Sequence, residues 1–213
     1  MRMLLLNLLV LCFIIVFSSS AFAFSFSILG GSALSFPTPL TIYQDGYETI
    51  KIDSAQWETR PFYEAPYYSI RFTFGLWSIE LIHHKLYLIS EHPDIQQFWI
   101  THGYNLILLE RLIQKDSWFY SLGAGVVVAH PETIVRGQEL SDPPHAEISF
   151  TGYYFSGIAG HASIGYKIKL LSHISFIVET KLTAAWARVP IANGHADVPN
   201  IAIHGIFGVE TNW

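Results

Sequence analysis

Apolar and polar residues alternate along most of the chain after residue 46, in runs rich in Ile, Val, Phe, Tyr and Thr. An alternation with a period of two is typical of β-strands that have one apolar and one polar face. The pattern predicts eight strands, at residues 47–59, 67–75, 76–89, 97–112, 117–130, 152–169, 173–188 and 198–213. Several of these runs exceed the about 9–11 residues with which a tilted strand crosses a bilayer.

The links between these strands alternate in length. Three links are short, at residues 75–76, 114–116 and 170–172, and four are longer, at residues 60–66, 90–96, 131–151 and 189–199. Outer-membrane barrels have short periplasmic turns and longer external loops in this order. The sequence therefore predicts an all-β fold, an eight-stranded antiparallel up-and-down transmembrane β-barrel.

The two faces of the predicted strands differ in charge. One face is apolar and uncharged, and in residues 97–112 this lipid-facing side is assigned to Tyr104, Leu106 and Leu108. The other face is rich in Gly, Ser and Thr, which suits a narrow polar lumen. Charges buried in such a lumen must be paired, so they are expected to form a network there. These charged residues are Arg71, Glu80, Lys167, Glu179, Lys181 and Glu210.

The start of the chain differs in composition from the remainder. Arg2 precedes an almost continuously apolar run at residues 4–17, and Ala21-Phe22-Ala23 follows, which predicts a cleaved secretory signal peptide at residues 1–23. A retained anchor is the alternative, but the run is short for a spanning helix. The barrel is assigned to residues 47–213, and residues 24–46 are a lead-in segment, compatible with a periplasmic segment, a plug or an additional strand.

Composition supports a lipid-facing surface. The chain is 51% hydrophobic and 14% charged, whereas soluble domains carry about 25% charged residues. The formal net charge of −5 argues against a nucleic-acid partner. The single cysteine, Cys12, lies within the predicted signal peptide, so no thiol is expected in the mature chain.

The last predicted strand carries a family resemblance. Residues 201–213 end on the aromatic Trp213, with Phe207 and Val209 at alternating positions before it. This pattern resembles the C-terminal strand by which outer-membrane barrels are recognised for assembly, and the mature chain resembles the small OmpA/OmpX-type barrels. The resemblance implies a bacterial outer-membrane location, with the barrel-assembly machinery, outer-membrane lipids and lipopolysaccharide as partners. Such barrels include structural, adhesive and lipid A-modifying proteins, so the fold leaves the function open.

A first candidate for catalysis is His161 with Ser163 and Glu179. The short link at residues 170–172 is expected to bring Glu179 roughly opposite Ser163, and the three residue types are those of an acyl-transfer site. The lipid A deacylase has a similar His-x-Ser pair, but in its last hairpin and facing lipid. At that place this chain has His195-Ala196-Asp197, without a serine. Membership of the lumen network is therefore the favoured interpretation for all three residues.

A second candidate is the predicted outer rim. One reading is a surface that binds lipopolysaccharide phosphates through Lys85, Arg136 and Arg188, and another is an outer-leaflet active site that uses His84. The alternative is a solvated polar rim. Neither H-x-x-x-H nor H-E-x-x-H spacing occurs, so no metal site and no cofactor is assigned. Glu132 also maps to this rim, and the rim's candidate ligand-binding residues are His83, His84, Lys85, His102, His130, Arg136 and Arg188.

The sequence thus favours a small, non-enzymatic integral outer-membrane barrel with a salt-bridged lumen and surface-exposed loops. The alternative is a lipid A-modifying acyl hydrolase or acyltransferase of the outer leaflet, and the sequence does not decide whether the protein is an enzyme. A narrow pore is disfavoured because the expected lumen is crowded with charged residues.

Overall fold

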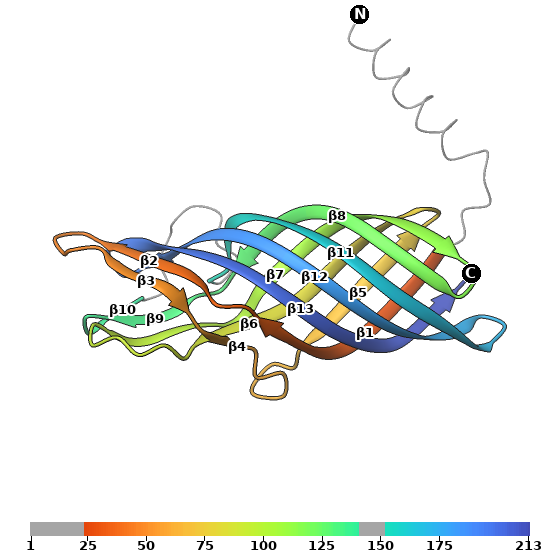
Figure 1. Ribbon diagram of the computed structural model, residues 1–213, viewed down its shortest axis with the longest axis horizontal. Coiled ribbons are helices and arrows are strands. Elements are labelled where there is room, and N and C mark those ends of the chain that lie inside the picture. The colour runs from red at the N-terminus through yellow and green to blue at the C-terminus, as the bar shows by residue number, and fades with distance from the viewer. Residues whose placement is uncertain (1–23, 141–151) are drawn as a thin grey trace, which may run out of the picture.

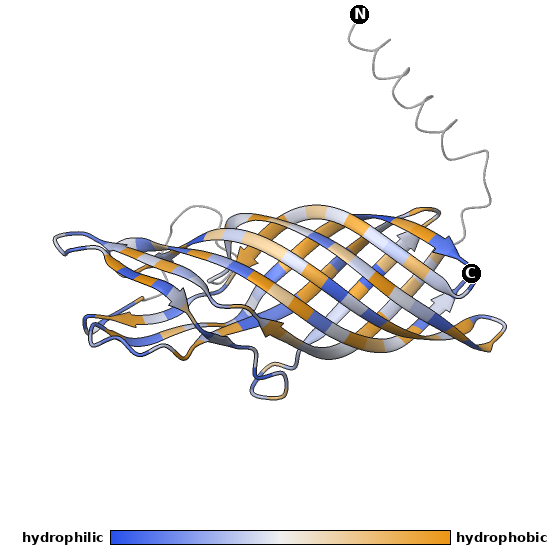
Figure 2. Ribbon diagram, viewed as in Figure 1, coloured by the Kyte–Doolittle hydropathy of each residue, from blue (hydrophilic) through white to orange (hydrophobic). Residues whose placement is uncertain are grey.

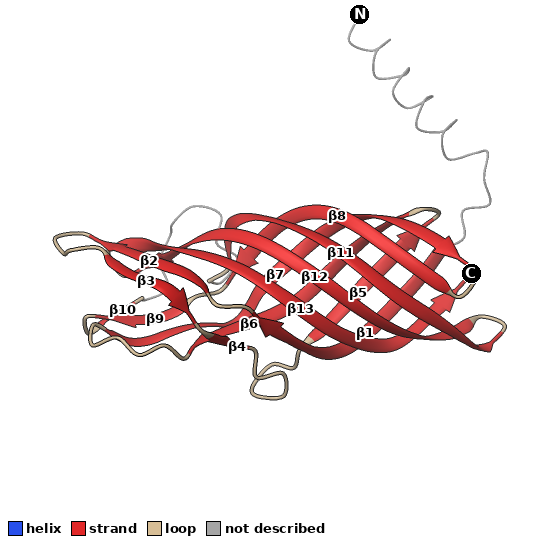
Figure 3. Ribbon diagram, viewed as in Figure 1, coloured by secondary structure: helices blue, strands red, loops and turns tan. Residues whose placement is uncertain are grey.

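The computed structural model describes residues 24–140 and 152–213. The predicted signal peptide and most of the predicted link at 131–151 lie outside the described residues. Every regular element in the described ranges is a β-strand (Figure 3), and these ranges contain no helix long and apolar enough to cross a membrane. The strands are β1 (Phe24–Ser35), β2 (Thr38–Gln44), β3 (Ile50–Ala55), β4 (Trp57–Glu58), β5 (Tyr68–Phe74), β6 (Trp77–Leu88), β7 (Ile95–Lys115), β8 (Trp118–Ala129), β9 (Glu132–Val135), β10 (Gln138–Glu139), β11 (Tyr154–Leu171), β12 (Ile174–Ile191) and β13 (Gly194–Asn212).

Eight of these strands close a barrel. The ring runs β1-β5-β6-β7-β8-β11-β12-β13 and back to β1, and every neighbouring pair is antiparallel. Tight turns at residues 75–76, 116–117 and 172–173 lie at one end, together with residue 24 and the C-terminus (Figure 1). We call this the short-turn end and the opposite one the outer end. The predicted fold class, with its likeness in architecture to the small OmpA/OmpX-type barrels, is confirmed.

The first barrel strand is β1, and the predicted strand at 47–59 is wrong. Strand β1 pairs with β13 on one side, where Ser25 faces Asn212, and with β5 on the other. Within the described residues the barrel therefore starts at Phe24, so part of the lead-in segment is the additional strand left open by the sequence. Residues 24–28 alternate strictly between apolar residues and serine, but Gly30 and Gly31 then interrupt the pattern. Residues 50–58 instead form the short strands β3 and β4, outside the ring.

Apolar and polar residues alternate along the barrel strands (Figure 2), and large apolar side chains on all eight strands are exposed, forming a belt around the barrel. Leu122 on β8 is 68% exposed and Ile158 on β11 is 69% exposed, although both are large aliphatic residues. Such a continuous surface is stable only against lipid, where a closed barrel satisfies every backbone group. Exposed members of the belt from the eight strands include Ile28, Phe72, Ile79, Leu109, Leu122, Ile164, Val178 and Phe207.

Strand β7 has the opposite orientation to the predicted one. Tyr104, Leu106 and Leu108 are buried in the lumen, whereas Ile107 and Leu109 are exposed on the lipid-facing side. The prediction was wrong because residues 106–109 are apolar on both faces, so alternation cannot distinguish inside from outside there. The correction has a chemical consequence, because it also turns Glu110 into the lumen.

The strands continue past the belt into an outer extension. Strands β12 and β13 are joined by a two-residue turn, so the predicted long link at 189–199 is wrong. Strand β2 pairs with β13 and β3, β4 pairs with β6, and β9 pairs with β7 and β10 (Figure 1). The rings of Trp57 and Phe98 meet edge to face inside this extension. Its buried apolar residues include Leu40, Ile42, Trp57, Phe98, Ile100, Val135, Val189 and Val198.

The guanidinium of Arg136 joins the tips of this extension. From the turn between β9 and β10, its Nε donates to Asp94 Oδ2 over 3.1 Å and its Nη1 donates to Gln44 Oε1 over 3.1 Å. Its Nη2 donates to the carbonyl oxygen of Glu48 over 2.8 Å. One side chain therefore connects three separate segments, and the extension is a packed, cross-linked structure rather than a set of free loops.

Candidate functional site

The middle of the lumen holds a cluster of buried charges. Arg71 Nη2 lies 3.1 Å from Glu80 Oε2 and 2.5 Å from Glu179 Oε2. Lys181 Nζ contacts Glu80 and lies 3.0 Å from Glu110 Oε1 and 3.6 Å from Glu179 Oε1. These side chains are at most 1% exposed. The cluster joins strands β5, β6, β7 and β12 across the lumen, and each charge has at least one partner of opposite sign.

The remaining predicted lumen charges form a second group near the short-turn end. Lys167 Nζ lies 2.7 Å from Glu210 Oε1. Ser25 and Ser27 of β1 donate to Glu210 Oε2 over 3.2 and 3.4 Å. The six residues that the sequence places in one lumen network are therefore divided between two levels of the barrel.

Glu110 is the member of the central cluster that sequence reasoning missed. It accepts from Ser78 Oγ over 2.9 Å and lies 3.0 Å from His161 Nε2. The incorrect orientation of β7 hid it. The available signal was a carboxylate directly after the apolar run at residues 106–109, which is costly to bury unless it faces buried cations. With Glu110 included, three carboxylates face two permanent cations and one histidine.

The structure does not assemble the predicted acyl-transfer residues into a relay. Strand register places Ser163 opposite Lys181, and Glu179 opposite Gly165. Ser163 Oγ shares a 2.6 Å hydrogen bond with Ser121 Oγ. The His161 ring lies against Glu110 rather than against a serine. Each of the three residues thus has a different partner, and the site lies inside the barrel, away from acyl chains.

A second layer of polar rings fills the lumen above the charges. Tyr67 Oη lies 2.7 Å from His204 Nδ1, and His204 Nε2 lies 2.8 Å from Thr183 Oγ1. His84 is fully buried in this layer, with its Nε2 3.4 Å from Ser35 Oγ. The prediction that His84 lies on the outer rim is therefore wrong. Consecutive residues of β6 point to opposite sides, and His84 takes the inward one.

The cations that were expected to bind phosphate are not gathered at one place. Lys85 is buried, and its Nζ donates to the carbonyl oxygens of Tyr63 and Ala65, the latter over 2.6 Å. Its ammonium group thereby satisfies backbone acceptors of the loop at residues 60–66. Arg188 forms a surface pair with Asp197, with Nε 2.8 Å from Oδ1. Together with the internal contacts of Arg136, this arrangement does not provide a shared phosphate site.

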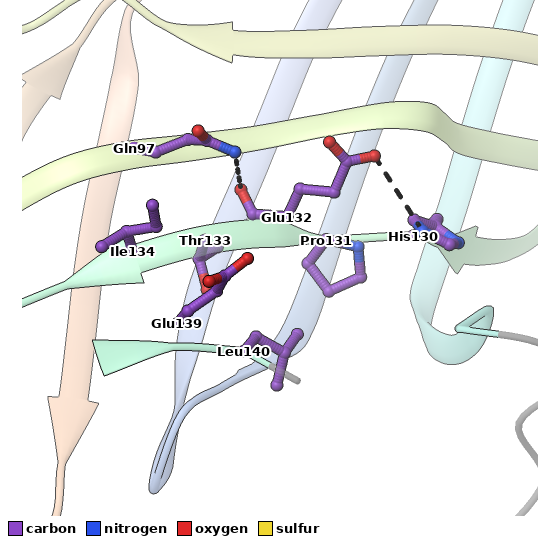
Figure 4. A pocket seen from close by; sticks show the side chains of 8 residues that line it. All are labelled: Gln97, His130, Pro131, Glu132, Thr133, Ile134, Glu139 and Leu140. Carbon is purple, nitrogen blue, oxygen red and sulfur yellow. Dashed lines mark hydrogen bonds and ion pairs between the residues drawn. The ribbon is translucent and has the colours of Figure 1, made fainter. Parts of the chain in front are cut away.

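Two of the predicted rim histidines, His102 and His130, lie together where β7 meets the connection between β8 and β9. His102 Nδ1 lies 2.7 Å from Glu132 Oε1, and His130 Nε2 lies 4.0 Å from the same oxygen. The centroids of the two imidazole rings are 4.9 Å apart. Figure 4 shows the carboxylate of Glu132 directed toward His130, while Gln97 holds the Glu132 carbonyl oxygen from the neighbouring strand. The sequence places Glu132 at the outer rim but does not include it among the candidate ligand-binding residues.

Two hollows adjoin this group. One, of about 380 Å³, is lined by His130, Glu132 and the other residues drawn in Figure 4. The other, of about 230 Å³, lies on the barrel exterior, where His102 and His83 stand beside the outward-facing Leu81 and Ile107. His83 stacks on Tyr68 with ring centroids 4.9 Å apart and bonds Asn105 over 2.9 Å.

Tyr153, directly before β11, packs edge to face on His130, with the ring centroids 4.9 Å apart. Burial raises the pKa of the Tyr153 phenol, and the neighbouring Tyr68 adds to this effect. The phenol therefore remains protonated and uncharged at neutral pH.

Comparison with known proteins finds no matching family model and no matching curated protein. Among solved structures, Neisserial surface protein A (NspA) is 8% identical with a TM-score of 0.42, covering 91% of this chain and 98% of that one. The Outer Membrane Protein W of E. coli is 11% identical with a TM-score of 0.41, covering 92% and 100%. Ail, the attachment invasion locus protein of Yersinia pestis, in complex with sucrose octasulfate, is 15% identical with a TM-score of 0.37, covering 89% and 99%. Likenesses this distant leave the function to be argued from the chain's own residues.

Proposed function

We propose that the protein is a non-enzymatic, non-conducting barrel of a bacterial outer membrane whose outer extension is the functional surface. The observation that carries the proposal is the contrast between the two halves of the molecule. The lumen is filled by charges and rings, whereas the strands beyond the belt form an extension with its own buried core. The barrel thus serves as an anchor, and the extension is held outside the bilayer.

The membrane assignment is supported by the apolar belt and by the closed backbone. No lipid-exposed edge remains in the ring of eight strands, as a bilayer requires. The outer membrane is the bacterial location of such barrels. The exposed Trp213 directly follows β13, which fits recognition by the barrel-assembly machinery, and a removed signal peptide at residues 1–23 fits export.

The filled lumen argues against a pore. Small barrels have interiors just wide enough for side chains, and here two layers cross the interior. An ion entering the central cluster would displace Lys181 or Arg71 from buried carboxylates, which is strongly unfavourable because it leaves charges unpaired.

The outer extension offers aromatic contact surface. Phe62 is 91% exposed and Tyr63 is 53% exposed, in the loop that Lys85 holds by its carbonyls. Aromatic side chains on a restrained loop are suited to binding because little entropy is lost when they are covered. Contact with lipopolysaccharide is proposed to involve such side chains and the top of the belt, since the rim cations have internal partners.

Location and orientation are tested by single introduced cysteines. We expect the mature chain to have no thiol of its own, so Asp45→Cys in the turn between β2 and β3 provides a unique label. A membrane-impermeant maleimide added to intact cells is expected to modify it and to leave Asp116→Cys, in a short turn, unmodified. Modification of Asp116→Cys alone would invert the proposed orientation, and equal modification of both would refute membrane embedding.

The lipid A-modifying alternative retains one supporting observation, the contact between His102 and Glu132 beside the lipid-facing hollow. Purified protein is incubated with lipopolysaccharide in detergent, and lipid A is analysed by mass spectrometry. An unchanged acyl pattern, together with the absence of conductance steps in planar bilayers, is expected. Loss of an acyl chain that His102→Ala abolishes would overturn the non-enzymatic proposal.

A further inference from the structure

The group at the outer rim brings together three side chains that bind metals elsewhere in proteins. His130, Pro131 and Glu132 follow one another along the chain, and residues two apart in an extended segment point to the same side. His102 comes from the neighbouring strand β7. The amide of His130 donates to the carbonyl oxygen of Gly103 over 3.0 Å, which fixes the two segments side by side.

The distances fit a metal centre. The ligand atoms of His102, His130 and Glu132 all lie within 4.8 Å of one another. A tetrahedral zinc site has bonds of about 2.0–2.2 Å, which separates its ligand atoms by about 3.3–3.6 Å. The separations from the Glu132 oxygen are 2.7 Å to His102 and 4.0 Å to His130. Small side-chain rotations would bring both to the required value, and His102 has room to rotate because it is 53% exposed.

We propose that His102, His130 and Glu132 bind a divalent transition-metal ion, for which Zn²⁺ is the best fit. Two imidazoles and one carboxylate are a donor set that suits zinc and its neighbours, whereas Mg²⁺ and Ca²⁺ prefer oxygen ligands alone. Three protein ligands leave a fourth position for water or for an anionic group from outside.

Neighbouring residues are placed to support the ligands. Thr101 is 1% exposed, and its hydroxyl donates to Glu132 Oε1, the oxygen that also meets His102. The Tyr153 ring packs on His130 from the other side. Such outer contacts orient metal ligands and tune their affinity. A plain hydrogen bond between Glu132 and His102 is the competing explanation, and it requires no third residue.

The test uses the full mature chain without an affinity tag, purified in detergent and freed of metal. Titration calorimetry with Zn²⁺ is expected to show one site per chain with a dissociation constant of about 10 μM or tighter. Co²⁺ is expected to give the intense visible absorption of a tetrahedral complex. His102→Ala and His130→Ala are each expected to weaken Zn²⁺ binding by more than the about 10–100-fold that loss of an outer contact costs.

His173→Ala is the matched control, because His173 is exposed in a turn at the short-turn end. It is expected to bind Zn²⁺ as the parent protein does. The temperature-dependent shift in gel mobility shows whether each variant remains folded. Binding no tighter than about 100 μM in the folded parent, or equal binding by parent and folded His102→Ala, would overturn the proposal. Thr101→Val separates the supporting contact from the ligands and is expected to weaken binding less than His102→Ala does.

Discussion

Replacing Lys181 by Met tests whether the lumen charges stabilise the barrel. Lys181 Nζ contacts Glu80 and Glu110 and lies 3.6 Å from Glu179, and its side chain is fully buried. Methionine has a similar length without the charge, so packing changes little. In Lys181→Met, three buried carboxylates face Arg71 as the single permanent cation of the cluster.

The expected cost follows from the burial of the group. Removing one partner of a buried ion pair destabilises proteins by about 3–5 kcal/mol, because a charge is left uncompensated away from water. Lys181 serves more than one carboxylate, so a loss of about 3–5 kcal/mol in the free energy of unfolding is expected. The double variant Lys181→Met, Glu80→Gln removes one excess negative charge and is expected to recover about 0.5–3 kcal/mol of it.

Equilibrium unfolding in urea, in lipid vesicles, measures this cost by tryptophan fluorescence and by the shift in gel mobility. Lys169→Met is the matched control, since Lys169 is exposed on the same hairpin. It is expected to change the free energy of unfolding by no more than about 0.5 kcal/mol. If Lys181→Met costs less than about 1 kcal/mol, or no more than the control, the reasoning about the lumen cluster is refuted.

Three further changes probe other parts of the structure. A Cβ at Gly165 would lie 2.1 Å from Cζ of the buried Phe119 ring, so Gly165→Ala is expected to cost about 1–3 kcal/mol in the same urea assay. Gly205→Ala, where nothing lies within 4 Å, should cost less, and equal costs would contradict the clash. Arg136→Ala is expected to speed hydrogen exchange in β9 and β10 without changing exchange in the barrel, and unchanged exchange at the tips would show that they are held otherwise. Lys85→Met is expected to make the bond after the exposed Phe62 more sensitive to chymotrypsin because the loop loses two anchors, and a cleavage rate equal to that of Lys169→Met would disprove this role.

Much of the barrel follows from local sequence because one of its faces meets lipid. In β11, Ile158, Ile164 and Ile168 are exposed and alternate with the inward His161 and Ser163, as the period of two predicts. The short turns lie within two residues of their predicted positions for the same reason, since alternation stops where pairing stops. In these strands the type of each residue indicates whether its side chain faces lipid or the lumen.

Where both faces of a strand carry the same kind of residue, residue type no longer indicates which face points into the lumen. Residues 106–109 are apolar throughout, so only pairing with β6 and β8 decides that Leu108 points inward and Leu109 outward. Strand β1 is a different case, because its glycines interrupt the alternation after a few residues, and pairing with β13 and β5 shows that it closes the ring. Glu110 was not assigned to the lumen because the sequence reversed the two faces of β7.

The sequence alone determined a lipid-facing barrel of eight strands, because alternation, turn spacing and composition are properties of neighbouring residues. Tertiary structure alone decided which residues meet. It placed Glu110 beside Lys181, separated Ser163 from Glu179, and brought His102 within reach of Glu132 thirty positions later. Such contacts depend on strand register across the barrel, and a shift of one residue reverses every side chain, so no local pattern can specify them.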